Sequence, residues 1–126
     1  MDASVRAAIA EAVEELRAHR AQFAYLHGSQ ASGYAAAGAD VDVAAFFARE
    51  DLLASDLVLP RSVDLLVLDT APLEIAGRIA ATGRLLFEAD AVARVRWEAM
   101  TRKIYFDERP RFERAHREFL ESVRHG

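Results

Sequence analysis

Residues 22–47 read QFAYLHGSQASGYAAAGADVDVAAFF, and the rest of the chain can be interpreted outward from this segment. Its first six residues are rich in aromatic side chains and stop at Gly28, which predicts a strand over residues 22–27. Small residues then fill positions 28–39 and separate this strand from a second one, expected over residues 40–47. The chain therefore begins its sheet with two short strands joined by a glycine-rich connection.

Two carboxylates lie at the start of the second expected strand, where residues 40–43 read DVDV. Because strand side chains alternate between two faces, both aspartates should share one face and both valines the other. A third carboxylate, Asp64, lies inside the apolar run SVDLLVL of residues 62–68, where a third strand is expected. Burial there costs several kcal/mol without a partner, so we expect Asp64 to be buried and paired, hydrogen-bonded or bound to a metal.

Helical patterns surround these strands on both sides. An N-terminal helix is indicated by apolar residues at helical spacing, namely Val5, Ile9, Val13 and Leu16. After the third strand, Asp69 or its neighbour should cap a helix that ends at Gly83, and residues 84–87 form a short fourth strand. From Asp90 onward the spacing is helical again, with a break expected at Pro110.

Strands and helices are mixed without strict alternation in this order, and residues 49–60 add a loop or short helix. The pattern predicts an α+β fold, in which a small mixed β-sheet is packed with helices and the C-terminus is helical. The length fits a single domain over residues 1–126. We expect a catalytic core of about residues 1–88 and a helical extension over residues 89–126.

The charges exclude several classes of function. The chain has 16 Lys+Arg against 20 Asp+Glu, a net charge of −4, and the acidic excess lies in residues 1–88. Since nucleic-acid affinity depends mostly on neutralised phosphates, we expect no direct nucleic-acid partner. The absence of cysteine excludes disulfides and thiol catalysis, and no apolar run approaches the roughly 20 residues that span a bilayer. We expect a cytoplasmic protein without membrane contact.

The glycine–serine segment after the first strand adds a second element of chemistry. Alone, Gly28-Ser29 is an ordinary turn. Beside three carboxylates it indicates a phosphate site, because glycine lets a backbone approach a phosphate and the Ser29 hydroxyl can bond its oxygens. Carboxylate oxygens suit Mg²⁺, and two such ions about 3.5–4 Å apart can hold the attacking and leaving oxygens of a phosphoryl displacement. The residues by themselves indicate metal-dependent nucleotidyl transfer.

Taken in this order and spacing, the glycine–serine segment and the three carboxylates resemble the signature of the DNA polymerase β-like nucleotidyltransferase superfamily. Residues 70–88 and 105–107 resemble in particular the small MNT (minimal nucleotidyltransferase) antitoxins, so the resemblance covers nearly the whole chain. It implies the polymerase β-like fold and a set of site residues. The implied nucleotide-binding residues are Gly28, Ser29 and Gly33, and the implied catalytic and metal-binding residues are Asp40, Asp42 and Asp64.

The resemblance also implies individual roles. Gly33 would permit a tight helix start, and Asp64 would complete the metal site and help deprotonate the incoming hydroxyl. One position departs from the family pattern, because Ala39 stands where these proteins usually have serine. The exchange removes one possible hydrogen bond near the phosphates and none of the carboxylates.

The function that the resemblance implies is that of an antitoxin. Such proteins transfer AMP from ATP to a tyrosine of a HEPN-domain ribonuclease toxin, with Mg²⁺ (two ions expected), and form a hetero-oligomeric complex with it. Two alternatives stay open. The chain could modify a small molecule such as an aminoglycoside, although only about the last 36 residues are free to form a substrate domain. It could also neutralise its toxin by binding alone, although the complete set of three aspartates argues against that.

A ribonuclease motif offers a further reading that the sequence disfavours. Arg111 and His116 have the Arg-x₄-His spacing of HEPN ribonucleases. HEPN domains are helical bundles, however, and at least three strands are expected before this motif. In an arginine-rich segment so short a motif arises readily by chance.

Overall fold

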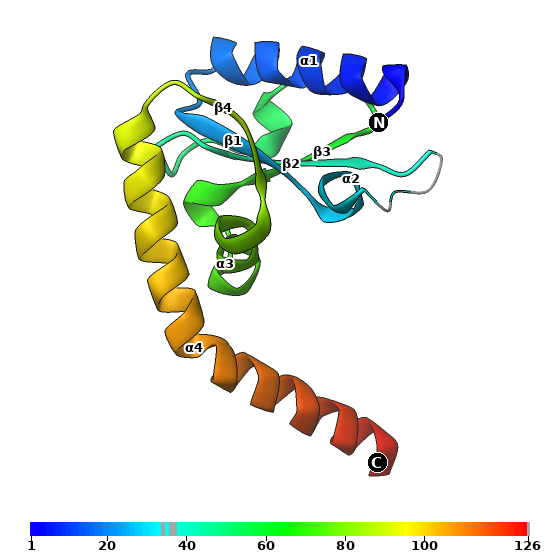
Figure 1. The fold of residues 1–126 in the computed structure, drawn as a ribbon, viewed down its shortest axis with the longest axis vertical. Helices are drawn as coiled ribbons and strands as arrows, with labels where there is room; N and C mark the ends of the chain where they lie inside the picture. Colours follow the sequence, from blue (N-terminus) through cyan, green and yellow to red (C-terminus); the bar gives the residue numbers. More distant parts are fainter. Residues whose placement is uncertain (34, 36–37, 126) are drawn as a thin grey trace.

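A computed structural model describes residues 1–33, 35 and 38–125 and shows helices packed on both faces of one sheet (Figure 1). The helices are α1 (Ala3–Ala18), α2 (Gly28–Ser32), α3 (Leu73–Thr82) and α4 (Ala91–His125), with short 3₁₀ turns η1 (Ala54–Asp56) and η2 (Leu68–Thr70). The strands are β1 (Phe23–His27), β2 (Val41–Phe46), β3 (Val63–Val67) and β4 (Arg84–Glu88). The α+β prediction is confirmed. Parts of the expected 28–39 connection (residues 34, 36 and 37) and of the C-terminal extension (residue 126) lie outside the described residues.

The four strands lie side by side in the order β3-β2-β1-β4. β1 is antiparallel to both β2 and β4, whereas β2 and β3 are parallel. The carboxyl end of β1 and the amino ends of β2 and β3 therefore meet at one end of the sheet. A backbone hydrogen bond from the Val41 amide to the Ser62 carbonyl oxygen, 2.7 Å long, aligns β2 and β3 at their amino ends.

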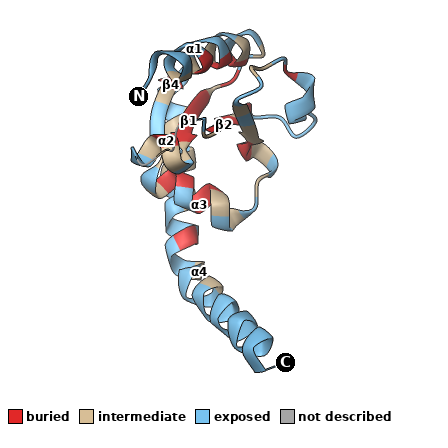
Figure 2. Ribbon diagram, turned by 90° about the vertical axis from the view of Figure 1, so that its right-hand side faces the viewer, coloured by how far each residue is buried: buried red, intermediate tan, exposed pale blue. Residues whose placement is uncertain are grey.

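Alternation along the strands divides the core into two layers, and the buried residues gather on the strands and on the inner faces of the helices (Figure 2). One layer lies between the sheet and α1 and includes Leu16, Ala24, Leu26, Val41 and Val43. The other lies on the face covered by α3 and the start of α4 and includes Phe23, Tyr25, Ala44, Leu66 and Trp97. Each strand thus assigns its odd and even residues to opposite faces, which fixes where the polar residues at its end must point.

A polar contact joins the first half of α4 to the sheet. The Tyr25 hydroxyl donates a 2.6 Å hydrogen bond to Glu98, and Arg94 pairs with the same carboxylate at 3.0 Å. Burial, followed by the hydrogen bond to Glu98, raises the pKa of Tyr25 well above its usual value. The tyrosine is therefore held as a neutral donor, and the first half of α4 is part of the packed body of the molecule.

Asp69 does not cap α3, so the sequence-based assignment of that cap is wrong. Pro72 occupies the position before the helix and makes no side-chain capping bond. The Asp69 carboxylate instead accepts hydrogen bonds from the backbone amides of Phe47 and Arg49, each 2.9 Å long. The reason is tertiary: η2 turns the chain at the end of β3 and directs Asp69 toward the neighbouring end of β2.

The break expected at Pro110 is also wrong, because α4 continues through this residue. Proline removes one helical N–H donor and crowds the preceding turn. Two ion pairs within the helix bridge the turns around Pro110. Arg109 pairs with Glu113 and Arg111 pairs with Glu108, both at 2.9 Å. The helix bends in its middle instead of ending (Figure 1).

Beyond this bend, α4 runs away from the rest of the molecule (Figures 1 and 2). All of its residues from 106 to 125 are exposed or partly exposed. Within residues 1–33, 35 and 38–125, no helix combines the length and the apolar character that crossing a membrane requires.

Gly77 permits the close packing of α3 on α4, and we expect Gly77→Ala to destabilise the protein by about 2 kcal/mol. A Cβ at this position would overlap with the Cβ and ring atoms of Tyr105. Overpacking of this kind costs about 1–3 kcal/mol or more, whereas the gain in helix propensity is about 1 kcal/mol. Urea unfolding followed by circular dichroism measures the difference. In a Tyr105→Gly background, which removes the Cβ as well as the ring, the same exchange should stabilise; destabilisation there would contradict the explanation.

Candidate functional site

Three polar side chains lie in a row at the end of the sheet where β1 stops and β2 and β3 begin. Asp42 is in register with Asp64 across the parallel pair and with His27 across the antiparallel pair. By alternation all three point to the face that α3 and α4 cover elsewhere. The topology thus brings together residues that are separated by 15 and 22 positions in the sequence.

Gly28 packs directly against the carboxylate of Asp42. Its φ is +70°, a left-handed conformation that glycine adopts without penalty. A Cβ built on Gly28 would overlap with a carboxylate oxygen of Asp42. Both the backbone conformation and the space therefore require glycine here, and its absent side chain leaves room for the Asp42 carboxylate.

The short helix α2 follows β1 immediately and carries the expected phosphate-binding residues. His27 precedes it without a side-chain capping bond, and Ser29 lies half-buried in its first turn. Gly33, with a φ of +81°, ends α2, so the expectation that it permits a helix start is wrong. The physical reason is that helices commonly stop at a left-handed glycine, and α2 is only five residues long.

Asp64 is exposed, so the prediction of a buried carboxylate is wrong. β3 is an edge strand, and only part of each of its faces is covered by a helix. Asp40 is exposed as well and lies just before β2 instead of within it. In the part of the chain that the structure describes, no three His, Asp or Glu side chains are gathered closely enough to hold a metal ion. Asp42 and Asp64 form a pair by register, and Asp40 stands two residues before that pair.

Two residues near the carboxylates were not assigned a role from the sequence. Burial lowers the pKa of His27, and the charges of Asp42 and Asp64 oppose that shift. Nothing local in the sequence singles out this histidine, because only the tertiary pairing of the strands places it beside both carboxylates. Gln30 is buried, and its amide donates a 3.4 Å hydrogen bond to the Ala39 carbonyl oxygen, which ties α2 to the segment that leads into β2.

Comparison with solved structures shows that the fold is shared with chains of toxin–antitoxin complexes. One is a crystal structure of a toxin–antitoxin with AMP-PNP (TM-score 0.65, 19% identity, covering 91% of this chain and 97% of that one). Another is the toxin–antitoxin MntA-HepT (TM-score 0.61, 16% identity, 94% and 97%). A third is a tri-AMPylated Shewanella oneidensis HEPN toxin in complex with MNT antitoxin (TM-score 0.57, 18% identity, 89% and 98%).

Comparison by sequence gives two results. No curated protein matches the chain. The family model described as polymerase beta, nucleotidyltransferase matches residues 10–92, which include all the strands and the whole glycine–carboxylate site. With this match over more than half its length, the chain belongs to the polymerase beta nucleotidyltransferase family.

Proposed function

We propose that this chain is an antitoxin nucleotidyltransferase that transfers AMP from ATP to a tyrosine hydroxyl of a cognate HEPN ribonuclease toxin and so neutralises it. The observation that carries the proposal is the packing of Gly28 against Asp42, with Asp64 in register beside it. The neighbours support the partner and the nucleotide: one is a toxin–antitoxin with AMP-PNP and another contains an AMPylated HEPN toxin.

The chemistry of the donor set suits Mg²⁺, since all three donors are carboxylates and this ion prefers oxygen ligands. We assign Asp42 and Asp64 as the fixed pair and Asp40 as the third ligand. When bound, Mg²⁺ neutralises phosphate charge at the site of displacement. A related MntA complex was solved with two aspartates, two positions apart, changed to glutamate, and that spacing is the spacing of Asp40 and Asp42.

The chain's own residues have separate roles in the transfer. Gly28 lets the backbone come close to the nucleotide phosphates, and the Ser29 hydroxyl donates a hydrogen bond to them. The tyrosine oxygen forms a bond to the α-phosphorus as the bond to pyrophosphate breaks. Asp64, exposed at the edge of the sheet, accepts the tyrosine proton. In this proposal the reaction takes place in the cytoplasm. Gly33 contributes to the nucleotide-binding segment as the residue that ends α2.

Incubation with ATP, Mg²⁺ and the toxin encoded by the neighbouring gene should increase the toxin's mass by one or more AMP units. Intact-mass spectrometry measures the gain, and peptide mapping should place it on tyrosine. EDTA should abolish it. An unmodified toxin in a stable complex would favour neutralisation by binding alone, and labelling of an aminoglycoside instead of the toxin would favour the small-molecule alternative.

A further inference from the structure

The second half of α4 carries an apolar stripe that continues the buried face of the first half. Trp97 and Tyr105 pack against the body of the molecule. From there Phe112, Ala115, Phe119 and Val123 follow at spacings of three and four residues, which keeps them on one side of the helix. Phe119 is 63% exposed and Val123 is 64% exposed. A helix face that is covered at one end is thus bare at the other.

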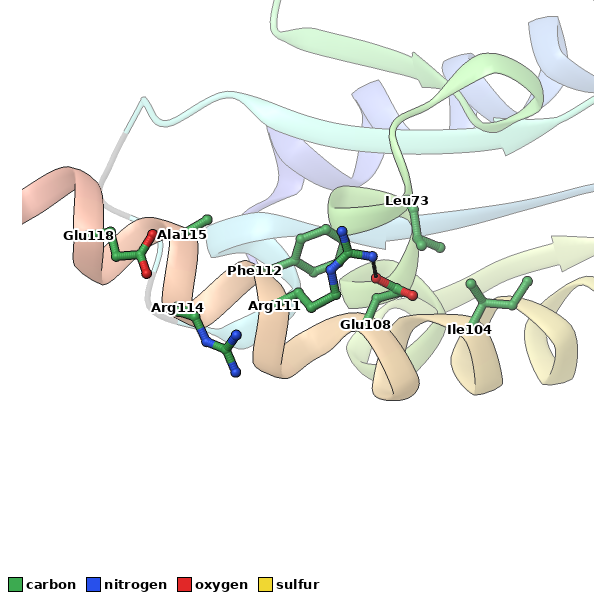
Figure 3. A pocket seen from close by; sticks show the side chains of 8 residues that line it. All are labelled: Leu73, Ile104, Glu108, Arg111, Phe112, Arg114, Ala115 and Glu118. Atoms are coloured by element: carbon green, nitrogen blue, oxygen red, sulfur yellow. Dashed lines mark hydrogen bonds and ion pairs between the residues drawn. The ribbon is translucent and has the colours of Figure 1, made fainter.

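A groove of about 660 Å³ lies where this stripe leaves α3 (Figure 3). Its apolar wall is formed by Leu73 at the start of α3 and by Ile104, Phe112 and Ala115 on α4, and charged side chains of α4 form its rim. The end of the same helix cannot fold back into this groove, because α4 is continuous and runs away from it (Figure 1). The end of a second α4 can fill it.

The stripe is complementary to itself when two helices run antiparallel. With the pair centred on Ala115, the small side chain lets the two helices approach closely, and Phe112 lies opposite Phe119 of the partner subunit. Val123 of the partner subunit then lies level with residue 107, between Ile104 and Glu108 of the groove. Every contact occurs twice, as two-fold symmetry requires.

The charges beside the stripe follow the same symmetry. In the antiparallel arrangement Arg111 faces Glu118 of the partner subunit, and Glu118 faces the partner's Arg111. Both side chains lie on the rim of the groove (Figure 3). Arg111 also pairs with Glu108 of its own helix at 2.9 Å, but its side chain is 78% exposed, so its guanidinium stays accessible to an approaching Glu118. Opposite charges in these positions select an antiparallel pairing of identical helices.

We infer that two copies of this chain form a dimer through their α4 helices, paired antiparallel about Ala115, with the tip of each helix in the groove of the other. The carboxylate site lies on the sheet end, outside this interface, so the dimer does not depend on the function proposed above.

Sedimentation or light scattering of the full chain tests this inference. We expect twice the monomer mass of 13.9 kDa. Ala115→Arg places two like charges at the centre and should give a monomer. Arg111→Glu and Glu118→Arg should each weaken dimerisation about tenfold or more, because like charges then face each other. The double variant Arg111→Glu/Glu118→Arg should restore it.

The matched control is Glu121→Arg, which changes the charge as Glu118→Arg does but lies on the side of α4 opposite the stripe. It should leave the dimer intact, and circular dichroism should show equal helix content in all variants. A monomeric wild-type chain, a dimer that survives Ala115→Arg, or a double variant that stays monomeric would each overturn the inference. A wild-type monomer that needs Phe119 to bind the toxin would also overturn it and would assign the stripe to the toxin.

Discussion

Asp42→Asn should lower the rate of AMP transfer at least about 100-fold while the protein stays folded. Asp42 is the central member of the row, in register with Asp64 and packed against Gly28. Asparagine keeps the size of the side chain and removes its charge, so the site loses the group best placed to hold a cation beside the phosphates. The loss of one such electrostatic contact typically lowers a rate 10²–10³-fold. Toxin labelling with radioactive ATP measures the rate, and thermal unfolding measures stability.

Asp69→Asn is the matched control for this experiment. Its carboxylate accepts two backbone hydrogen bonds at the end of β2 and belongs to the structure, not to the proposed site. We expect it to lower stability by about 1–3 kcal/mol and to leave the labelling rate of the folded protein unchanged. If the double variant Asp40→Asn/Asp42→Asn still labelled the toxin at the wild-type rate, the assignment of these carboxylates would be wrong.

Gly28→Ala should reduce transfer at least about tenfold and should also destabilise the protein by about 1–2 kcal/mol. The stability loss arises because alanine is strained at a φ of +70°. The loss of activity has a separate cause, since the new Cβ overlaps with the end of a flexible side chain, the Asp42 carboxylate, and pushes it aside. The backbone would at the same time be held further from the phosphates.

Gly38→Ala separates the two causes. Gly38 has a φ of +79°, so alanine is strained there to a similar degree, yet a Cβ would have no neighbour within 4 Å. We expect a similar loss of stability, with a much smaller effect on transfer by the molecules that remain folded. Equal losses of transfer in the two variants would show that backbone strain alone, and not the displaced carboxylate, controls the rate.

Local patterns in the sequence were sufficient to identify the four strands and the three longer helices, but not the short helix α2. Period-two alternation and bounding glycines located the four strands to within about one residue, and helical spacing identified α1, α3 and α4. Errors arose where a residue's surroundings came from another element, or where the neighbouring turns of a helix outweighed a local break signal. Asp69 matches a capping pattern, but the end of β2 lies close enough to use its carboxylate. Pro110 matches a helix break, but the turns on either side support a continuous helix.

The same distinction between local pattern and tertiary surroundings applies to the candidate site. The sequence determined which residue types are present: glycine where the backbone must be left-handed and three aspartates on or beside neighbouring strands. How these residues lie relative to one another depends on the tertiary structure, because strand order and register are set by long-range pairing that no local pattern encodes. That pairing placed Asp42 between His27 and Asp64 and against Gly28. It also put β3 at the edge of the sheet, which leaves Asp64 exposed where its apolar neighbours in the sequence had indicated burial.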